Sequence, residues 1–363
     1  MKTATTKTAP LFLRKFGPLL GAIAFYALIM ILRSADIING YYMQVMLFAG
    51  VNVMMTASLN LVNGFTGQFC IGHAGFMSLG AYGSAVITTL VFKGTSVAPA
   101  AQIPVFLLGL LCGGIVAALV GCLIGIPSLK LKGDYLAIVT LAFGEIIKEL
   151  INCLIIGYDE NGLHFIFNPA GNKTVDDLGL SASGTAIIKG AQGATGTATI
   201  ATFTAGFILV MITLIVVLNL TRSRAGRAIM AIRDNRIAAQ AIGLNLTKYK
   251  LMAFVTSAAL AGAAGALYGL NYSSLQATKF NFNLSILVLV FVVLGGLGNI
   301  WGSLVAAAAL TILPEALRQF ADFRMLIYAI VLIFVMLATN NPQAKAFFGR
   351  LLPHRRAAAE KED

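Results

Sequence analysis

Residues 103–126 read IPVFLLGLLCGGIVAALVGCLIGI, a stretch without a single charged side chain. A helix that crosses a hydrocarbon core about 30 Å thick needs roughly 20 apolar residues, because each residue adds about 1.5 Å to its length. The stretch is long enough to meet this requirement. It therefore predicts a helix that spans a lipid bilayer.

The rest of the chain has the same character. Of its 363 residues, 58% are apolar and 11% are charged, whereas soluble domains carry about 25% charged residues. Further apolar stretches lie at about 17–32, 43–62, 68–91, 134–157, 199–220, 251–270, 284–313 and 323–339. The composition argues against a water-soluble protein. The repeated stretches predict an all-α polytopic membrane protein that forms one domain over residues 1–363.

The net charge of +12 comes from 26 basic and 14 acidic residues. Lys and Arg collect in the cytoplasmic loops of membrane proteins, so this excess indicates orientation rather than nucleic-acid binding. The basic residues gather in segments 2–15, 130–132, 222–250 and 345–361. These segments lie on one side of the membrane only if the number of spans is even. That requires the stretch Leu284–Leu313 to break into two helices at Gly295–Gly302.

This topology has about ten transmembrane helices. The N-terminal tail (1–16), the segment at about 221–250 and the C-terminal tail (about 340–363) are then cytoplasmic. The loop at about 158–198 lies outside. It is rich in glycine, serine and threonine, a composition that requires no fixed fold.

The sequence lacks the common motifs of nucleotide-binding, metal-binding and catalytic sites. There is no G-x-x-x-x-G-K-[ST] phosphate loop, so we expect no ATP hydrolysis by this chain. The three histidines are too few and too scattered for a haem or multi-histidine metal site. The four cysteines lie in apolar stretches, where packing is their ordinary role. We therefore expect a protein that moves a solute rather than an enzyme, with no cofactor or metal.

Three polar side chains, Asn60, Gln68 and His73, lie at the expected membrane depth between Leu59 and Tyr82. Polar groups in hydrocarbon are costly unless they pair or line a wet cavity. Closely spaced glycines in the same stretch permit tight helix packing, or a broken helix that faces a pathway. The stretch predicts either part of a translocation path or a tightly packed interface joined by amide hydrogen bonds.

Glu145, Lys148 and Glu149 form a second polar group, within the stretch 134–157. Their spacing of i, i+3 and i+4 puts them on one face of a helix. A charge at the centre of a bilayer costs about 2.5–3.5 kcal/mol on insertion scales, so that face must look into the bundle or reach the interface. Glu145 is therefore either a fourth residue of the path or the partner of Lys148 in an internal ion pair. We call Asn60, Gln68, His73 and Glu145 the path residues.

The basic segment 221–250 has an apolar face. Ile229, Ile232 and Ile237 recur at helical spacing among charged residues, and Gly243 occupies the position of a C-terminal helix cap. This pattern predicts a short amphipathic helix between two spans. Such a helix either lies on anionic membrane lipid or docks a soluble partner that supplies energy.

Four stretches carry a family resemblance when they are taken in chain order. They are LNLVNGFTGQFCIGHAGFMSLGAY (59–82), KGDYLAIVTLAFGEI (132–146), GRAIMAIRDNRIAAQAIGLNLTKYKLMAFVTSAALAGAAGALYG (226–269) and VLGGLGNIWG (293–302). Together they resemble the LivM-type permeases of branched-chain amino acid ABC importers. The resemblance implies a ten-helix permease of the bacterial inner membrane. Its partners would be a LivH-like second permease, two cytoplasmic ABC ATPase subunits and a periplasmic substrate-binding protein.

The resemblance also implies a short cytoplasmic coupling helix that contacts an ATPase. Its residues map onto Gly226, Arg227, Ala231, Ile232, Arg233, Ala238, Ala239 and Gly243. The implied substrates are leucine, isoleucine and valine. Urea and short amides are the alternative, because urea permeases share most of these stretches. An ion-coupled secondary carrier is a further alternative; it would use Glu145 as a proton or cation site and need no ATPase.

Overall fold

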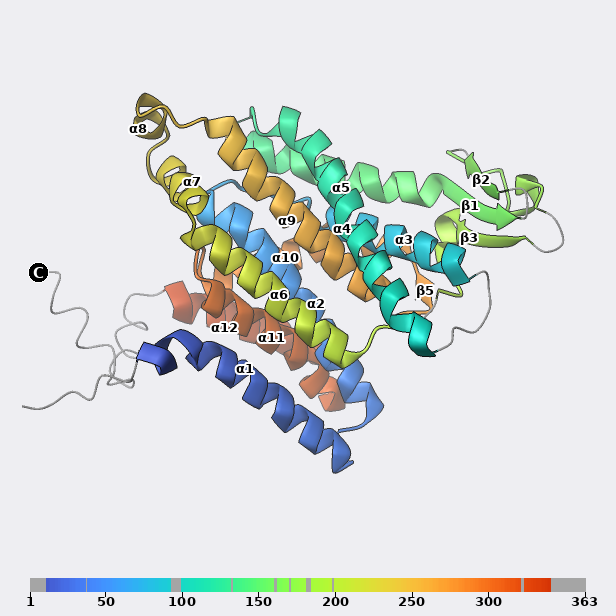
Figure 1. Ribbon diagram of the computed structural model, residues 1–363, viewed down its shortest axis with the longest axis horizontal. Coiled ribbons are helices and arrows are strands. Elements are labelled where there is room, and N and C mark those ends of the chain that lie inside the picture. The colour runs from blue at the N-terminus through green and yellow to red at the C-terminus, as the bar shows by residue number, and fades with distance from the viewer. Residues whose placement is uncertain are drawn as a thin grey trace, which may run out of the picture.

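The computed structural model describes residues 11–340, apart from 37, 93–98, 132, 160–161, 170, 181–183, 198 and 321–322. Helices form most of this part of the chain and lie together in a bundle (Figure 1). The longer ones are α1 (Leu11–Ser34), α2 (Gly40–Asn60), α3 (His73–Phe92), α4 (Pro99–Ser128), α5 (Asp134–Cys153), α6 (Phe203–Arg222), α9 (Leu246–Gly269), α10 (Phe282–Gly295), α11 (Ile300–Ala316) and α12 (Arg324–Asn340). The predicted tails lie outside the described residues over 1–10 and 341–363, whereas residues 11–16 already belong to α1.

Six helices within the described residues are long and apolar enough to cross a membrane. They are Gly40–Phe65, His73–Val91, Gln102–Ser128, Phe203–Arg222, Leu246–Gly269 and Ala277–Gly295. Gly21–Ser34 and Ile300–Ala316 are shorter apolar helices. The chain is therefore a polytopic membrane protein, while the number of about ten spans stays a prediction.

Helices α3, α4 and α9 pack against one another within the bundle. Glycines let their backbones touch. A Cβ atom built on Gly80 of α3 would lie 1.9 Å from the carbonyl oxygen of Gly262 in α9, and one on Gly265 would lie 1.9 Å from that of Met77. Small residues at such contacts are typical of helices that pack in lipid. The contact between α3 and α9 therefore depends on residues without side chains.

The long apolar stretch near the C-terminus breaks into two helices, as the charge distribution predicts. α10 ends at Gly295 and α11 begins at Ile300. Asn299 caps α11, because its Oδ1 accepts a hydrogen bond from the backbone N–H of Gly302 at 3.2 Å. A Cβ atom on Gly295 would lie 2.1 Å from the Cα atom of Ser303, so α10 and α11 meet closely at this turn.

The segment after α5 forms four strands and joins a fifth, which follows α9, in an antiparallel sheet of order β2–β1–β3–β4–β5. Its strands are β1 (Leu154–Asp159), β2 (Gly162–Phe167), β3 (Thr185–Lys189), β4 (Ala194–Thr195) and β5 (Ser274–Leu275). The all-α fold class is therefore wrong here, as is the expectation that 158–198 needs no fixed fold. The predicted span 134–157 also ends earlier, at Cys153.

Two features of the sequence favour strands in this sheet. Burial along β1 has a period of two, and the β-branched side chains of Ile155, Ile187 and Ile188 are almost completely buried. Both features favour strands, but the many glycines around them obscure the pattern in the sequence. The sheet lies at the opposite end of the bundle from two short helices, α7 (Arg224–Asp234) and α8 (Arg236–Ala241) (Figure 1).

Candidate functional site

The predicted coupling segment forms two short helices rather than one. α7 begins after Ser223, whose side chain accepts a hydrogen bond from the N–H group of Gly226 at 3.1 Å. Asn235 then ends α7 and caps α8, because its Oδ1 accepts hydrogen bonds from the N–H groups of Ile237 and Ala238 at 3.1 and 3.0 Å. Asparagine is among the strongest N-cap residues. The prediction of a single amphipathic helix is therefore wrong.

The eight predicted coupling residues fall into two groups. The buried ones hold α7 and α8 to the bundle; they are Gly226, Ile232 and Ala239. A Cβ atom on Gly226 would lie 2.2 Å from the carbonyl oxygen of Leu220, so a larger residue does not fit. The exposed or half-buried ones can face a partner; they are Arg227, Ala231, Arg233, Ala238 and Gly243.

Two isoleucines at this end of the molecule are exposed. Ile237 of α8 is 82% exposed, and Ile242, directly after α8, is 76% exposed. We call these two side chains the α8 tip. Helical spacing in the sequence puts Ile237 on the same face as the buried Ile229 and Ile232, but the new helix that starts at Asn235 turns it outward. Sequence reasoning placed Ile237 on the same face as Ile229 and Ile232 and did not single out Ile242. Asn235, a residue type preferred as an N-cap, is the signal that could have indicated the new helix.

Arg233 connects α7 to the bend between α2 and α3. After α2 the chain forms a π-helical turn, Leu61–Phe65, and α3 starts only at His73. Nη1 of Arg233 donates a hydrogen bond to the carbonyl oxygen of Gly64 in this turn at 3.0 Å. The aliphatic part of the same side chain lies against Gly67, where a Cβ atom would be 2.7 Å from Cγ. The position of α7 is thereby linked to the bend.

Asn60 is fully buried and joins the end of α2 to the turn between α10 and α11. Its Oδ1 accepts a hydrogen bond from the N–H group of Gly298 at 2.9 Å, and its Nδ2 donates one to Oγ of Ser303 at 2.9 Å. The backbones also meet, because a Cβ atom on Gly64 would lie 2.4 Å from the nitrogen of Gly298. We call this meeting of the two turns the Gly64–Gly298 contact. Arg233 is hydrogen-bonded directly to it.

His73 and Gln68 are both buried but differ in their partners. Nε2 of His73 lies 2.7 Å from Oγ of Ser58, and Ser257 donates a hydrogen bond to the Ser58 carbonyl oxygen, so α2, α3 and α9 are joined. Oε1 of Gln68 accepts a hydrogen bond from Thr66 at 3.4 Å, but its buried Nε2 has no partner in the described part of the chain. A buried unpaired amide is costly. Gln68 is thus the path residue with hydrogen-bonding capacity left for a solute.

Glu145 lies where α5 meets the start of α10. Its Oε1 accepts a hydrogen bond from the N–H group of Phe282, the first residue of α10, at 2.8 Å. Its Oε2 pairs with Lys148. A carboxylate at a helix N-terminus is stabilised by the partial positive charge there. The internal ion pair that the sequence offered is therefore formed, while a transport role for the four path residues stays a prediction.

Apolar helices long enough to cross a membrane, joined by buried polar side chains, define a helical multi-pass membrane protein. Residues 41–338 match the family described as the permease component of branched-chain amino acid transport systems. The chain belongs to this family.

Individual relatives agree with the family. The high-affinity branched-chain amino acid transport system permease protein LivM of Salmonella typhimurium is 33% identical over 316 residues, which cover 83% of this chain and 71% of the relative. LivM of Escherichia coli is 33% identical over 294 residues, covering 79% of this chain and 66% of the relative, just under two thirds of its length. The probable LivM of Methanocaldococcus jannaschii is 25% identical over 293 residues, which cover 73% of this chain and 77% of the relative. No solved structure matches the chain.

Proposed function

We propose that this chain is a permease subunit of an ATP-driven importer that carries leucine, isoleucine and valine across the bacterial inner membrane. The family match over residues 41–338 is the observation that carries the proposal. The substrate class rests on the names of relatives that are 33% identical. Separate subunits hydrolyse ATP, because this sequence has no phosphate loop.

The importer combines this chain with a LivH-like second permease, two cytoplasmic ATPase subunits and a periplasmic substrate-binding protein. About ten helices of this chain cross the membrane, and both termini are cytoplasmic. The α8 tip then faces the ATPases, and the sheet faces the binding protein. The position of these two features at opposite ends of the bundle supports this arrangement (Figure 1).

The α8 tip inserts into an apolar groove on an ATPase subunit, as amphipathic helices do in other complexes. When the ATPases close, α7 moves together with the tip, and the hydrogen bond from Arg233 to Gly64 passes the motion to the Gly64–Gly298 contact. That contact lies at the ends of α2 and α10. Its displacement shifts the bundle between outward and inward access.

The path residues line the route that opens. Gln68 supports this assignment through its buried, unpaired amide, and Glu145 through its position between α5 and the start of α10. A binding protein that delivers the substrate removes the need for a tight site in the permease. A few polar contacts along the route are then sufficient.

Uptake of labelled leucine tests the proposal, in a strain that lacks other leucine importers. Deletion of this gene should abolish uptake, and excess unlabelled urea should not compete in the parent strain. Loss of labelled urea uptake, with leucine uptake intact, would instead assign urea or short amides. Uptake that persists without the ATPase subunits would identify an ion-coupled carrier and refute an ATP-driven importer.

A further inference from the structure

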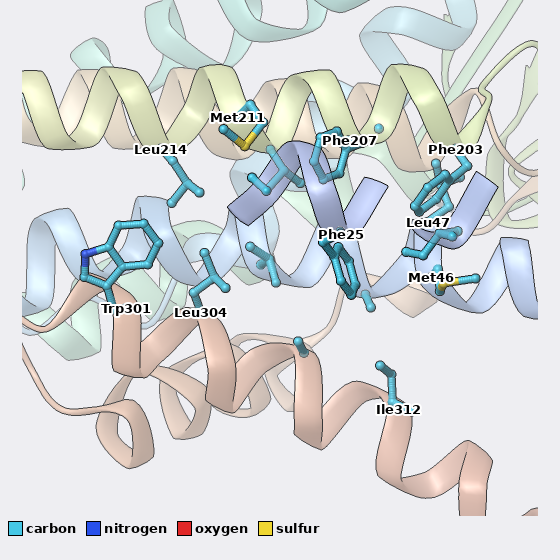
Figure 2. Close-up of a pocket in the computed structure, with 18 residues that line it drawn as sticks. Phe25, Met46, Leu47, Phe203, Phe207, Met211, Leu214, Trp301, Leu304 and Ile312 are labelled. Carbon is cyan, nitrogen blue, oxygen red and sulfur yellow. The ribbon is translucent and has the colours of Figure 1, made fainter. Parts of the chain in front are cut away.

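An apolar groove lies between α1, α2, α6 and α11 (Figure 2). Its volume is about 380 Å³, and every residue that lines it is apolar or glycine. Phe203 and Leu47 mark one end, and Trp301 marks the other. Phe25 is 57% exposed and Trp301 is 47% exposed, so the groove opens to the surface of the bundle.

The dimensions of the groove match one lipid chain. It follows α6 from Phe203 to Leu214, a length of about 16 Å at about 1.5 Å per residue. This is about half of the 30 Å hydrocarbon core, or one leaflet. The groove therefore accommodates an alkyl chain that reaches from one membrane surface to the bilayer centre.

A polar pocket of about 390 Å³ continues from the groove, and Leu47 and Phe203 line both. Its polar side chains are Arg33, Gln44, Thr199, Thr202 and Asn271. Arg33 forms no ion pair with any described residue. The N-termini of α2 and α6 also open here and add partial positive charge. The pocket is thus suited to an anionic group.

We propose that the groove and the polar pocket together bind one anionic phospholipid. One acyl chain lies in the groove, and the phosphate lies beside Arg33. The apolar groove, the adjoining pocket with Arg33, and the groove length of about one leaflet each agree with this occupant. The lipid seals the lateral opening between α1 and α11 on the side of the bundle that carries the sheet.

Trp301 offers a direct test, because it is the single tryptophan of the chain and lies at the end of the groove away from the polar pocket. The full chain is reconstituted in phosphatidylcholine bilayers that contain increasing amounts of phosphatidylglycerol brominated near its acyl ends. Bromine quenches tryptophan fluorescence on contact. We expect quenching that saturates at a low mole fraction of the brominated lipid. Quenching that only follows the bulk mole fraction overturns the proposal.

Three variants sharpen the test. Ala308→Phe fills the groove from α11 and should return quenching to the bulk level. Val305→Phe adds an aromatic ring on the same helix, at a 64% exposed position that does not line the groove, and should retain saturable quenching. Arg33→Gln should raise the half-saturating lipid fraction about five-fold, the effect of one basic residue on attraction to anionic lipid. Equal quenching curves in all four proteins overturn the proposal.

The assembled importer distinguishes a lipid from a neighbouring subunit. A photoreactive benzoylphenylalanine replaces Phe25, whose aromatic ring already lines the groove and is 57% exposed, and the membranes are irradiated before purification. An adduct with the mass of a phospholipid supports the proposal. A crosslink to another polypeptide shows that the groove is a subunit contact and overturns it. Neither result depends on the transported substrate.

Discussion

Replacing both isoleucines of the α8 tip, as Ile237→Ser with Ile242→Ser, should weaken the binding of the ATPase subunits. Burying an isoleucine that starts fully exposed stabilises a complex by about 1.5–3 kcal/mol. The two side chains are 82% and 76% exposed in the free chain. Their complete burial on an ATPase therefore contributes about 2.5–4.5 kcal/mol, and its loss raises the dissociation constant roughly 70- to 2,000-fold.

The assay is a titration of ATPase subunits onto the full permease pair held in bilayer nanodiscs. The matched control is Leu163→Ser with Phe165→Ser, which removes side chains that are 54% and 76% exposed from β2 at the opposite end of the bundle. This control should leave the affinity for the ATPase unchanged. Both double variants should unfold at the wild-type temperature, because all four side chains are exposed. Wild-type affinity in the α8 variant would refute the docking role of the tip.

Other residues give shorter tests. Arg233→Ala should lower leucine uptake about ten-fold and leave ATP hydrolysis intact. The reason is that a partly exposed hydrogen bond from a charged group contributes about 1.5 kcal/mol. The control, Arg236→Ala on the neighbouring helix, should match the wild-type uptake. Gln68→Ala with Glu145→Gln should reduce uptake without reducing ATP hydrolysis, and unchanged uptake would remove both from the path. Gly265→Val should prevent α9 from packing on α3, so that size-exclusion chromatography recovers no monodisperse protein; normal recovery would contradict the backbone contact.

Apolar length and charge distribution made much of the helical fold predictable. A bilayer imposes the same length on every span, so the stretch 103–126 lies inside α4. The glycines between Gly295 and Gly302 mark the place where α10 ends and α11 begins. These signals are local in the sequence, and each comes from a requirement that the membrane makes of every helix.

The sheet and the site depend on contacts that are distant in the sequence. β5 has two residues and pairs with β4, so no local pattern reveals it. The need of Asn60 and Glu145 for polar partners was predictable, but two of these partners, Gly298 and Phe282, lie on other elements. The exposure of Ile237 depends on how α8 sits on the bundle. Single-sequence reasoning therefore identified the polar residues and the pairing of Glu145 with Lys148, but not the partners that lie far away in the sequence.

One continuous segment connects both ends of the molecule. It leaves the sheet at β5, enters α10 beside Glu145 and reaches the α10–α11 turn at Gly298. If this segment couples the two ends, linkage requires the coupling to be reciprocal. A protein bound at the sheet must then change the affinity of the α8 tip for an ATPase by some factor. A bound ATPase must change the affinity of the sheet for that protein by the same factor. The permease would thus report substrate delivery to the ATPase before any substrate has crossed.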